Sequence, residues 1–528
     1  MATTITLEIH PAIGIARMGS SDEFFFGPEP GLPMETNRRD ATPDKLLKRQ
    51  AARFRVYSCV RDDQGTLVSF EELSPATATI TWTVHLVNRK AAAPRFLGRN
   101  GMPNTDPTFR RNGATGDDAL DSALIIDGGA QTLTGPLQPR KTIPGQFKGN
   151  DLPRGLGEMS TDANGRLVVV GGYGLSRSFP TTPIGNFADN DNWHDDISDG
   201  PVEATVHFLD GRPDQAVDKP AWVIACQPDF APGVGNLVTL YDAFIDQAIA
   251  RSVLPMPTFR PAYDRDVLPL LNRATAYRWV NTFARDAHAP GRPADFASIP
   301  NLGDPTVAVP KRKSIFRLLR NPAGPATPPG TPAMPSLFSD DYDFTGATPN
   351  RLVLPLTRPQ YRILLEWSND AFDATGPALT ELEPDALTRM VLEACAGGSF
   401  CPGIEAGRKI RDASIYAAEE VFRFDRSRLN PGGLTESMAV PWQADFADCA
   451  WEAPVPPVPP HKGRGWWPAQ RPDDVLLHAD DTAMVPWARG VDSWQSMVDQ
   501  WDQLGVILEA TDSSGAPAFV ETQRNLPG

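Results

Sequence analysis

Cysteine is scarce in this sequence, and the few cysteines lie too far apart for a disulfide framework. The 528 residues include five cysteines, at positions 59, 226, 395, 401 and 449. Disulfide-stabilised domains carry closely spaced cysteines in even numbers. The amino-terminal MATTITLEIHPAIG (1–14) also lacks the basic region and apolar block of a signal peptide. The sequence therefore predicts free thiols and a reducing, cytoplasmic location.

Long apolar runs, basic stripes and common nucleotide or hydrolase motifs are missing as well. No apolar stretch reaches the ~20 residues that a membrane-spanning helix needs. Acidic residues outnumber basic ones, 65 to 50, for a net charge of −15. The sequence has no stripe of Lys and Arg residues that could bind along the phosphate backbone of a nucleic acid. The glycine cluster VGGYG (170–174) lacks the context of a dinucleotide-binding loop, and GxSxG and CxxC are absent. We expect neither a nucleic acid nor a membrane as partner.

Proline, by contrast, is abundant and spread along the chain. The 53 prolines are about twice the usual ~5% of residues. Proline fixes φ and removes a backbone donor, so this spread indicates ordered loops and short strands. Five segments are β-branched and partly alternating, as expected of strands. They are TITLEI (4–9), FRVYSC (54–59), ATITWTVHLV (78–87), RLVVVGG (166–172) and EATVHF (203–208).

Helical spacing of apolar residues appears only later in the chain. It predicts helices over 236–251, over 383–398 with Pro384 near the start, and over 493–505 with Asp492 or Ser493 as the cap. Strands first and helices later indicate an α+β fold, large and irregular. We expect a β-rich, loop-rich part over 1–225 and a mixed helical and loop part over 226–528, or one integrated domain. The Pro/Gly-rich segment 321–336 is predicted to be a linker or a long surface loop.

Two clusters are candidates for chemistry. The segment NWHDDISDG (192–200) holds His194, Asp195, Asp196 and Asp199, which either bind a cation or order a loop through local hydrogen bonds. The latter is our prediction, with no metal. The segment 445–472 places Cys449 near Asp445 and, beyond a proline-rich arm, near Trp466–Trp467. These side chains either form an aromatic cluster or become one redox group.

Six blocks of the sequence resemble the lysine ε-oxidase and glycine oxidase family, whose members are quinoprotein amine oxidases. They are IHPAIGIARMGSSDEFFFGPE (9–29), GRLVVVGGYG (165–174), DNWHDDISDGPVEATV (191–206), CAGGSFCPGIE (395–405), AVPWQADFADC (439–449) and WWPAQRPDDV (466–475). The blocks occur in order over nearly the whole chain. The cofactor of that family is cysteine tryptophylquinone, made from the protein's own side chains.

The resemblance implies the roles of individual residues. Asp445, four residues before Cys449, matches the spacing of the aspartate that accompanies the crosslinked pair. Cys449 would be joined to Trp467, with Trp466 as the alternative. Asp445 would be the base, and His461 and Lys462 could assist or could be solvated loop residues.

The implied reaction is the oxidative deamination of a primary amine or amino acid through a Schiff base, with O2 reduced to H2O2. A flavoprotein partner is expected to mature the cofactor, and the chain could form a homo-oligomer. Two alternatives stay open. The chain could use the same fold to bind or modify a peptide or a biosynthetic intermediate, or it could be a non-catalytic binding protein.

Overall fold

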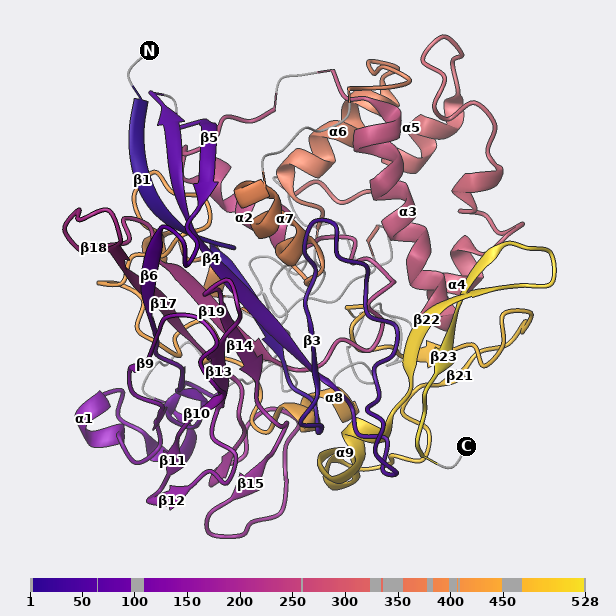
Figure 1. Cartoon of the computed structure of the whole chain (residues 1–528). Coiled ribbons are helices and arrows are strands. Elements are labelled where there is room, and N and C mark those ends of the chain that lie inside the picture. The colour runs from indigo at the N-terminus through magenta and orange to yellow at the C-terminus, as the bar shows by residue number, and fades with distance from the viewer. Residues whose placement is uncertain are drawn as a thin grey trace.

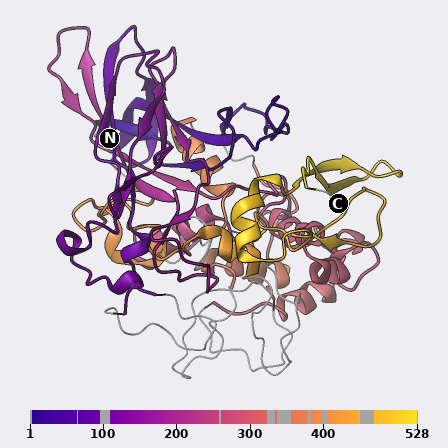
Figure 2. The same ribbon diagram turned by 90° about the horizontal axis from the view of Figure 1, so that it is seen from below.

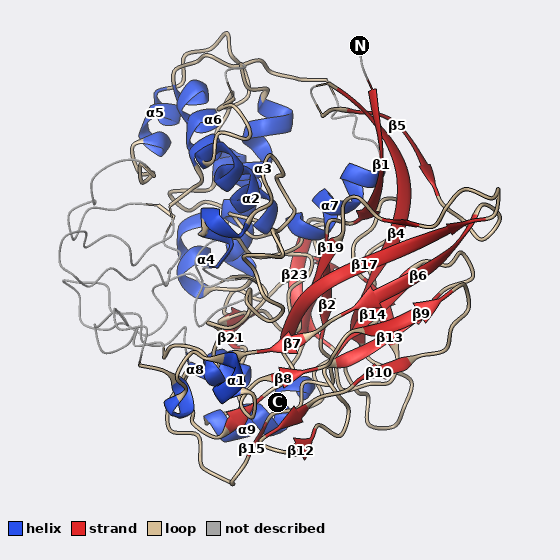
Figure 3. Cartoon of the chain, turned by 90° about the vertical axis from the view of Figure 1, so that its left-hand side faces the viewer, coloured by secondary structure: helices blue, strands red, loops and turns tan. Residues whose placement is uncertain are grey.

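The chain folds around one large curled sheet, with most helices gathered on one side of it (Figures 1 and 3). The computed structural model describes residues 3–63, 65–95, 109–257, 260–322, 334–335, 355–377, 383–397, 406, 409–448 and 468–526. Within these residues the sheet has 15 strands. They are β1 (Thr3–His10), β2 (Ile13–Arg17), β3 (Phe24–Phe26), β4 (Arg49–Asp62), β5 (Leu67–Glu72), β6 (Ala78–Val84), β7 (Val87–Asn88), β8 (Ile126–Asp127), β9 (Gln131–Thr134), β10 (Lys141–Ile143), β13 (Gly157–Thr161), β14 (Leu167–Gly171), β17 (Ser198–Phe208), β18 (Gln215–Ala216) and β19 (Ala221–Cys226).

The strand order through the sheet is β10-β13-β14-β4-β2-β19-β17-β6-β9. Most pairs are antiparallel, but β19 runs parallel to β2, with Trp222 opposite Ile13. Four separate two-stranded ribbons lie outside this sheet. They are β11 (Gln146–Phe147) with β12 (Asn150–Asp151), β15 (Arg177–Ser178) with β16 (Trp193–His194), β20 (Asp474–Val475) with β21 (Val485–Pro486), and β22 (Val506–Thr511) with β23 (Pro517–Thr522). The ribbon β22–β23 extends away from the sheet near the carboxyl terminus (Figure 2).

The α-helices among the described residues follow mainly after the sheet. They are α1 (Asp118–Asp121), α2 (Leu240–Ala250), α3 (Leu268–Ala276), α4 (Thr282–His288), α5 (Pro310–Phe316), α6 (Arg358–Ser368), α7 (Glu383–Glu393), α8 (Trp442–Asp448) and α9 (Trp494–Gln500). The α+β prediction is confirmed. In the part of the chain that the structure covers, no helix has the length and apolar character needed to cross a membrane.

The central strand β19 shows how the sheet is buried on both faces. Successive side chains of a strand point to opposite sides of the sheet. All six residues of β19 are buried, so both faces of the sheet are covered at this strand. Trp222 and Ile224 pack with Phe244 of α2 and Leu392 of α7 on one face. Val223, on the opposite face, joins the core formed by the other strands. Helices α2 and α7 therefore cover one face of the sheet, beside β2 and β19 (Figure 3).

The predicted strands and helices are confirmed, with shifted ends. The segments 4–9, 54–59, 78–87, 166–172 and 203–208 lie in β1, β4, β6 with β7, β14 and β17. Helix α2 begins after Thr239, whose side chain and that of Asp242 form a capping box. Helix α9 is capped by Ser493 and ends at Gln500, where a 3-10 turn takes over, so it is shorter than the predicted 493–505.

Two predictions about the organisation of the chain stay predictions: the boundary between residues 225 and 226, and the linker or surface loop over 321–336. Strand β19 ends at Cys226 and α2 begins at Leu240, so the change from strands to helices falls near the expected boundary between 225 and 226. Most of the Pro/Gly-rich segment 321–336 lies outside the described residues. Of its described part, Met334 forms a bridge to Leu319 through the backbone.

Candidate functional site

Helix α8 carries Asp445, the predicted base, in a buried setting. Only 2% of the surface of Asp445 is exposed to solvent. Trp442 and Phe446, one turn apart on the same helix, meet edge to face with ring centroids 5.0 Å apart. Trp442 also lies 5.2 Å from the Trp501 ring, and α8 lies beside α9 (Figure 1). Aromatic packing therefore fixes one face of the helix that presents Asp445.

The amino-terminal end of α8 is held by residues from the β-rich part. The backbone N–H of Trp442 donates to Asp195 Oδ2 at 3.0 Å. The same oxygen accepts from Lys90 Nζ at 2.5 Å, and both side chains of this ion pair are completely buried. Gln443 donates to the Gly174 carbonyl at 2.8 Å and accepts from the Ser176 hydroxyl at 2.7 Å.

The carboxyl-terminal end of α8 is held by Arg471. Its Nε donates to the Phe446 carbonyl at 2.7 Å, and its Nη1 donates both to the Pro472 carbonyl and to Asp473. The buried arginine therefore satisfies one of the carbonyls left open where a helix ends. It also joins two segments that are separated by 25 positions in the sequence.

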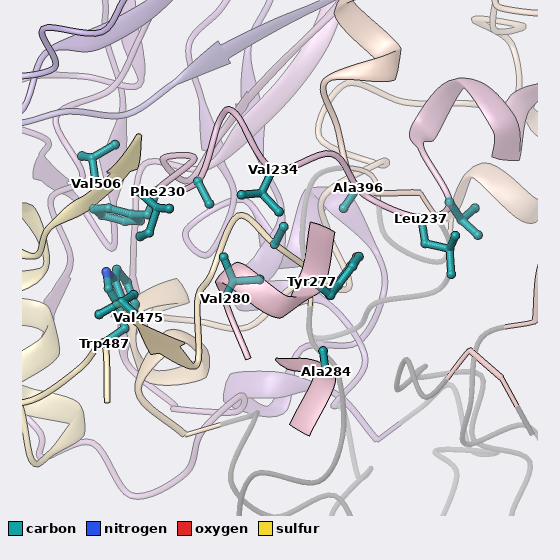
Figure 4. Packing of buried hydrophobic residues seen from close by; sticks show 14 of the residues in the cluster. Phe230, Val234, Leu237, Tyr277, Val280, Ala284, Ala396, Val475, Trp487 and Val506 are labelled. Carbon is teal, nitrogen blue, oxygen red and sulfur yellow. The ribbon is translucent and has the colours of Figure 1, made fainter. Parts of the chain in front are cut away.

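The segment after the tandem tryptophan is fixed in the same core. The N–H of Ala469 donates to the Asn236 side chain at 3.1 Å, and the Gln470 carbonyl accepts from the N–H of Phe230 at 3.0 Å. Phe230 packs against Trp487 with ring centroids 4.9 Å apart, and Figure 4 shows both with the surrounding buried residues. Residues 468–472 are therefore buried in this core.

Several predicted site residues lie outside the described part of the chain. They are Cys449, His461, Lys462, Trp466 and Trp467. Their assignments stay predictions, as does the choice between Trp466 and Trp467. Of the predicted residues, the structure describes Asp445, and it brings the segments that precede Cys449 and follow Trp467 into contact through Arg471.

Comparison with known proteins gives two family matches that together cover more than half of the chain. Residues 10–225 match the L-lysine epsilon oxidase N-terminal domain, and residues 343–467 match the L-lysine epsilon oxidase C-terminal domain. The chain belongs to the L-lysine epsilon oxidase family. The resemblance stated from the sequence blocks is confirmed.

Relatives of this family match over nearly their whole length. The L-lysine 6-oxidase of Marinomonas mediterranea is 27% identical over 99% of this chain and 90% of its own. The crystal structure of the L-Lys epsilon-oxidase from that organism superimposes with a TM-score of 0.77 at 25% identity, covering 98% of this chain and 95% of that chain. A crystal structure of the Schiff base intermediate of that oxidase with L-Lys gives a TM-score of 0.74.

In this member of the L-lysine epsilon oxidase family, the acidic segment 192–200 is not the locally ordered loop that we predicted. Residues 193–194 form β16, and β17 begins at residue 198. Local bonds are present: the Ile197 N–H donates to Asp195, and the Trp193 N–H donates to the Asn190 carbonyl. The other partners are distant in sequence: Asp199 accepts from Thr435 and Trp222, and Asp196 accepts from the N–H of Gly174. Local turn propensity missed these contacts because tertiary packing supplies the donors.

The cation alternative for this segment gains no support from the geometry. The His194 ring contacts two phenyl rings, with its centroid 4.9 Å from that of Phe147 and 5.8 Å from that of Phe179. Burial lowers the pKa of His194 to about 4, so the ring is neutral at pH 7. The carboxylates of Asp195 and Asp199 are engaged by protein donors. We therefore assign this segment to holding the fold together.

The stability of the folded chain should depend on pH through Asp196. Burial, with a contribution from the Asp195 charge, raises the pKa of Asp196 to about 7, although the Leu175 and Gly174 amides act against it. An unfolded Asp titrates near ~3.9, so the folded state binds the proton more tightly; the resulting stabilisation is complete below about pH 4 and is lost as the pH rises through about 7.

Asp196→Asn removes this titration. The free energy of unfolding is measured in urea for the Asp196→Asn variant and for the parent chain. The difference, variant minus parent, should rise by about 2 kcal/mol between about pH 5 and pH 8, because only the parent chain loses stability as Asp196 ionises. Parallel stability curves for the two proteins over that range would contradict the prediction. Asp210→Asn, which changes a solvent-exposed carboxylate, is the control and should leave the curve unchanged.

The structure also brings together Glu8, His10 and Cys59, whose potential ligand atoms lie within 4.8 Å of one another. Arg61 contacts both oxygens of Glu8 at 2.7 Å. Burial raises the pKa of Glu8, but hydrogen bonds from Arg61 and His10, with the charge of Arg423, outweigh it and hold this pKa well below its usual range. Burial raises the pKa of Cys59 to about 12, so its thiol stays protonated. With guanidinium groups already bound to the carboxylate, this cluster is an internal ion-pair network.

Sequence reasoning missed Lys90, Arg471 and Asn236 as parts of the site. Each acts through a contact with a residue more than 20 positions away. Arg471 lies inside the block WWPAQRPDDV, so the resemblance marked its neighbourhood without assigning it a role. For Lys90, no local pattern in the sequence distinguishes a buried lysine from an exposed one.

Proposed function

We propose that the chain is a cysteine-tryptophylquinone-dependent oxidase that deaminates a primary amine or amino acid through a Schiff base and reduces O2 to H2O2. Membership of the L-lysine epsilon oxidase family supports the coarser part, an oxidoreductase that acts on an amino group. The crystallographic relative trapped as a Schiff base with L-Lys supports a small amino acid as substrate class.

The observation that carries the cofactor assignment is the contact between Arg471 and Phe446. Cys449 follows Phe446 by three residues, and Trp467 precedes Arg471 by four. Residues 447–448 continue α8 with a rise of ~1.5 Å per residue, and the four residues from 467 to 471 span at most ~3.3–3.6 Å each, so both ends of the segment 449–467 start close to this contact. The residues on either side of the segment 449–467 therefore fit a crosslink between Cys449 and Trp467, or Trp466.

The protein-derived quinone would supply an electrophilic carbonyl that accepts the amine nitrogen and two electrons. In balance, the amine and water become an aldehyde or keto acid and ammonia, while O2 takes up two electrons and two protons as H2O2. The chain's own contribution is a carboxylate, Asp445, that removes the proton from the carbon bearing nitrogen. Its burial excludes bulk water from competing for that proton. His461 and Lys462 are proposed to assist.

Intact mass and visible absorption of the chain, produced with a flavoprotein maturation partner, test the cofactor. Relative to the unmodified chain, we expect two added oxygen atoms and four lost hydrogens: two from forming the thioether and two from forming the quinone. A visible chromophore should accompany this mass and should bleach when a primary amine is added without O2. An unmodified mass in protein that still oxidises amines would overturn the cofactor assignment. An unmodified, colourless and inactive chain would favour the binding or peptide-modifying alternatives.

A further inference from the structure

We propose that the buried Lys90–Asp195 ion pair is a positioning device for Asp445. Both side chains are fully buried, and their contact is 2.5 Å. Asp195 Oδ2 accepts from Lys90 and also from the N–H of Trp442, the first residue of α8. This inference rests on the proposed role of Asp445 as base and adds the residues that place that base.

The α8 helix depends on a distant carboxylate because its own sequence provides no cap. The first N–H groups of a helix have no partner within the helix, and a preceding Ser, Thr, Asp or Asn usually accepts from them. Here Val440 and Pro441 precede Trp442, and neither has a side-chain acceptor. Asp195, which is 247 positions away, supplies the oxygen, and its negative charge suits the positive end of the helix.

Asp195 is itself held in one orientation. Asn88 Nδ2 donates to its carbonyl at 2.9 Å and to Oδ1 at 3.1 Å, and the Ile197 N–H donates to Oδ1 at 3.2 Å. Both carboxylate oxygens are therefore engaged, and Oδ2 has little freedom to move away from Trp442. A buried ion pair contributes uncertainly to stability, but a fully hydrogen-bonded one specifies a single geometry.

The same acidic region aligns the segment that leads into α8. Asp199 accepts from the N–H and the hydroxyl of Thr435, and Asn190 donates to the Val440 carbonyl. Arg111 links the Asp189 carboxylate to the Met438 carbonyl. The segment 435–442 is thus bound along its length, and Asp195 makes the contact at the first residue of α8.

Asp445 lies three residues after Trp442, on the same side of the helix and one turn further on. A displacement of Trp442 is therefore passed directly to Asp445. Proton transfer needs the base within hydrogen-bonding reach of its target, and a misplacement of ~1 Å can cost about 10²-fold in rate. Asp195 and Lys90 do not touch the reacting atoms, so they are positioning residues.

Asp195→Asn tests the inference, with Glu8→Gln as the matched control. Glu8 is also a buried carboxylate bound to a cation, but it lies on β1, away from α8 (Figure 1). In the chain produced without the maturation partner, we expect amide hydrogen exchange over 440–447 to be at least about ten-fold faster in Asp195→Asn than in the parent chain. Glu8→Gln should leave exchange over 440–447 unchanged even where its global stability falls.

In the matured protein, Asp195→Asn should lower kcat by about 10²-fold while KM changes by less than about three-fold. If this variant does not fold, Asn88→Ala, which removes the amide that orients Asp195 and accepts from the Lys90 N–H, should show the same pattern at about ten-fold in kcat. Unchanged exchange over 440–447 in Asp195→Asn, or a kcat equal to that of Glu8→Gln, overturns the inference. An inactive, colourless parent chain would instead overturn the proposed function, and the exchange comparison would still decide whether Asp195 holds α8.

Discussion

Asp445→Asn should either block formation of the quinone or leave a coloured protein that binds amine without turning it over. Asparagine keeps the shape of the side chain and some of its hydrogen bonding but cannot take up a proton. General-base assistance is commonly worth ~10²–10⁴-fold, so kcat for amine oxidation should fall by at least about 10²-fold. The position is buried in α8, between the aromatic packing of Trp442 and the contact that Arg471 makes, so the isosteric change should leave the helix in place.

Asp448→Asn is the control for Asp445→Asn. Asp448 lies one residue before Cys449 and three after Asp445, and we expect it to tolerate the change. The measurements are the visible spectrum, the rate of bleaching by amine without O2, and steady-state kcat. Full activity in Asp445→Asn together with inactivity in Asp448→Asn would mean that the base has been assigned to the wrong carboxylate.

Cys449→Ala should abolish the crosslink, the chromophore and the oxidase activity together. Peptide mapping of the parent chain should recover Cys449 joined to Trp467, or to Trp466, after maturation. In Cys449→Ala no thioether can form, and the tryptophans should be recovered in linear peptides. Trp467→Phe and Trp466→Phe separate the two candidates, since only the variant that lacks the true partner should lose the crosslink.

Cys395→Ala is the matched control for Cys449→Ala. Cys395 is buried, with its Sγ 3.5 Å from a nitrogen of Arg17 and 3.2 Å from the Val391 carbonyl. Its loss should cost about 1–2 kcal/mol of stability and leave the chromophore intact. A colourless but well-folded Cys395→Ala, with colour retained in Cys449→Ala, would show that the cofactor is built on the other thiol.

The sequence by itself determined the local elements and the class of fold. Alternation in ATITWTV predicted β6, and in the structure Ala78, Ile80, Trp82 and Val84 are its buried residues. The Ser493 cap and the apolar spacing predicted α9, and six ordered blocks identified the L-lysine epsilon oxidase family. These signals are readable because secondary structure repeats with a short period, so that neighbouring residues report which side of an element is buried.

Only the tertiary structure decided how Asp445 is held. The Lys90–Asp195 pair spans 105 positions, Asp195 reaches Trp442 across 247, and Arg471 reaches Phe446 across 25. A periodic pattern states that a face is buried but not which distant residue meets it. The acidic segment 192–200 was visible in the sequence, yet its partners are set by the strand order and by where the segment 435–443 returns to the sheet. Its carboxylates are therefore bound by distant donors, because burying them requires partners that local sequence does not supply.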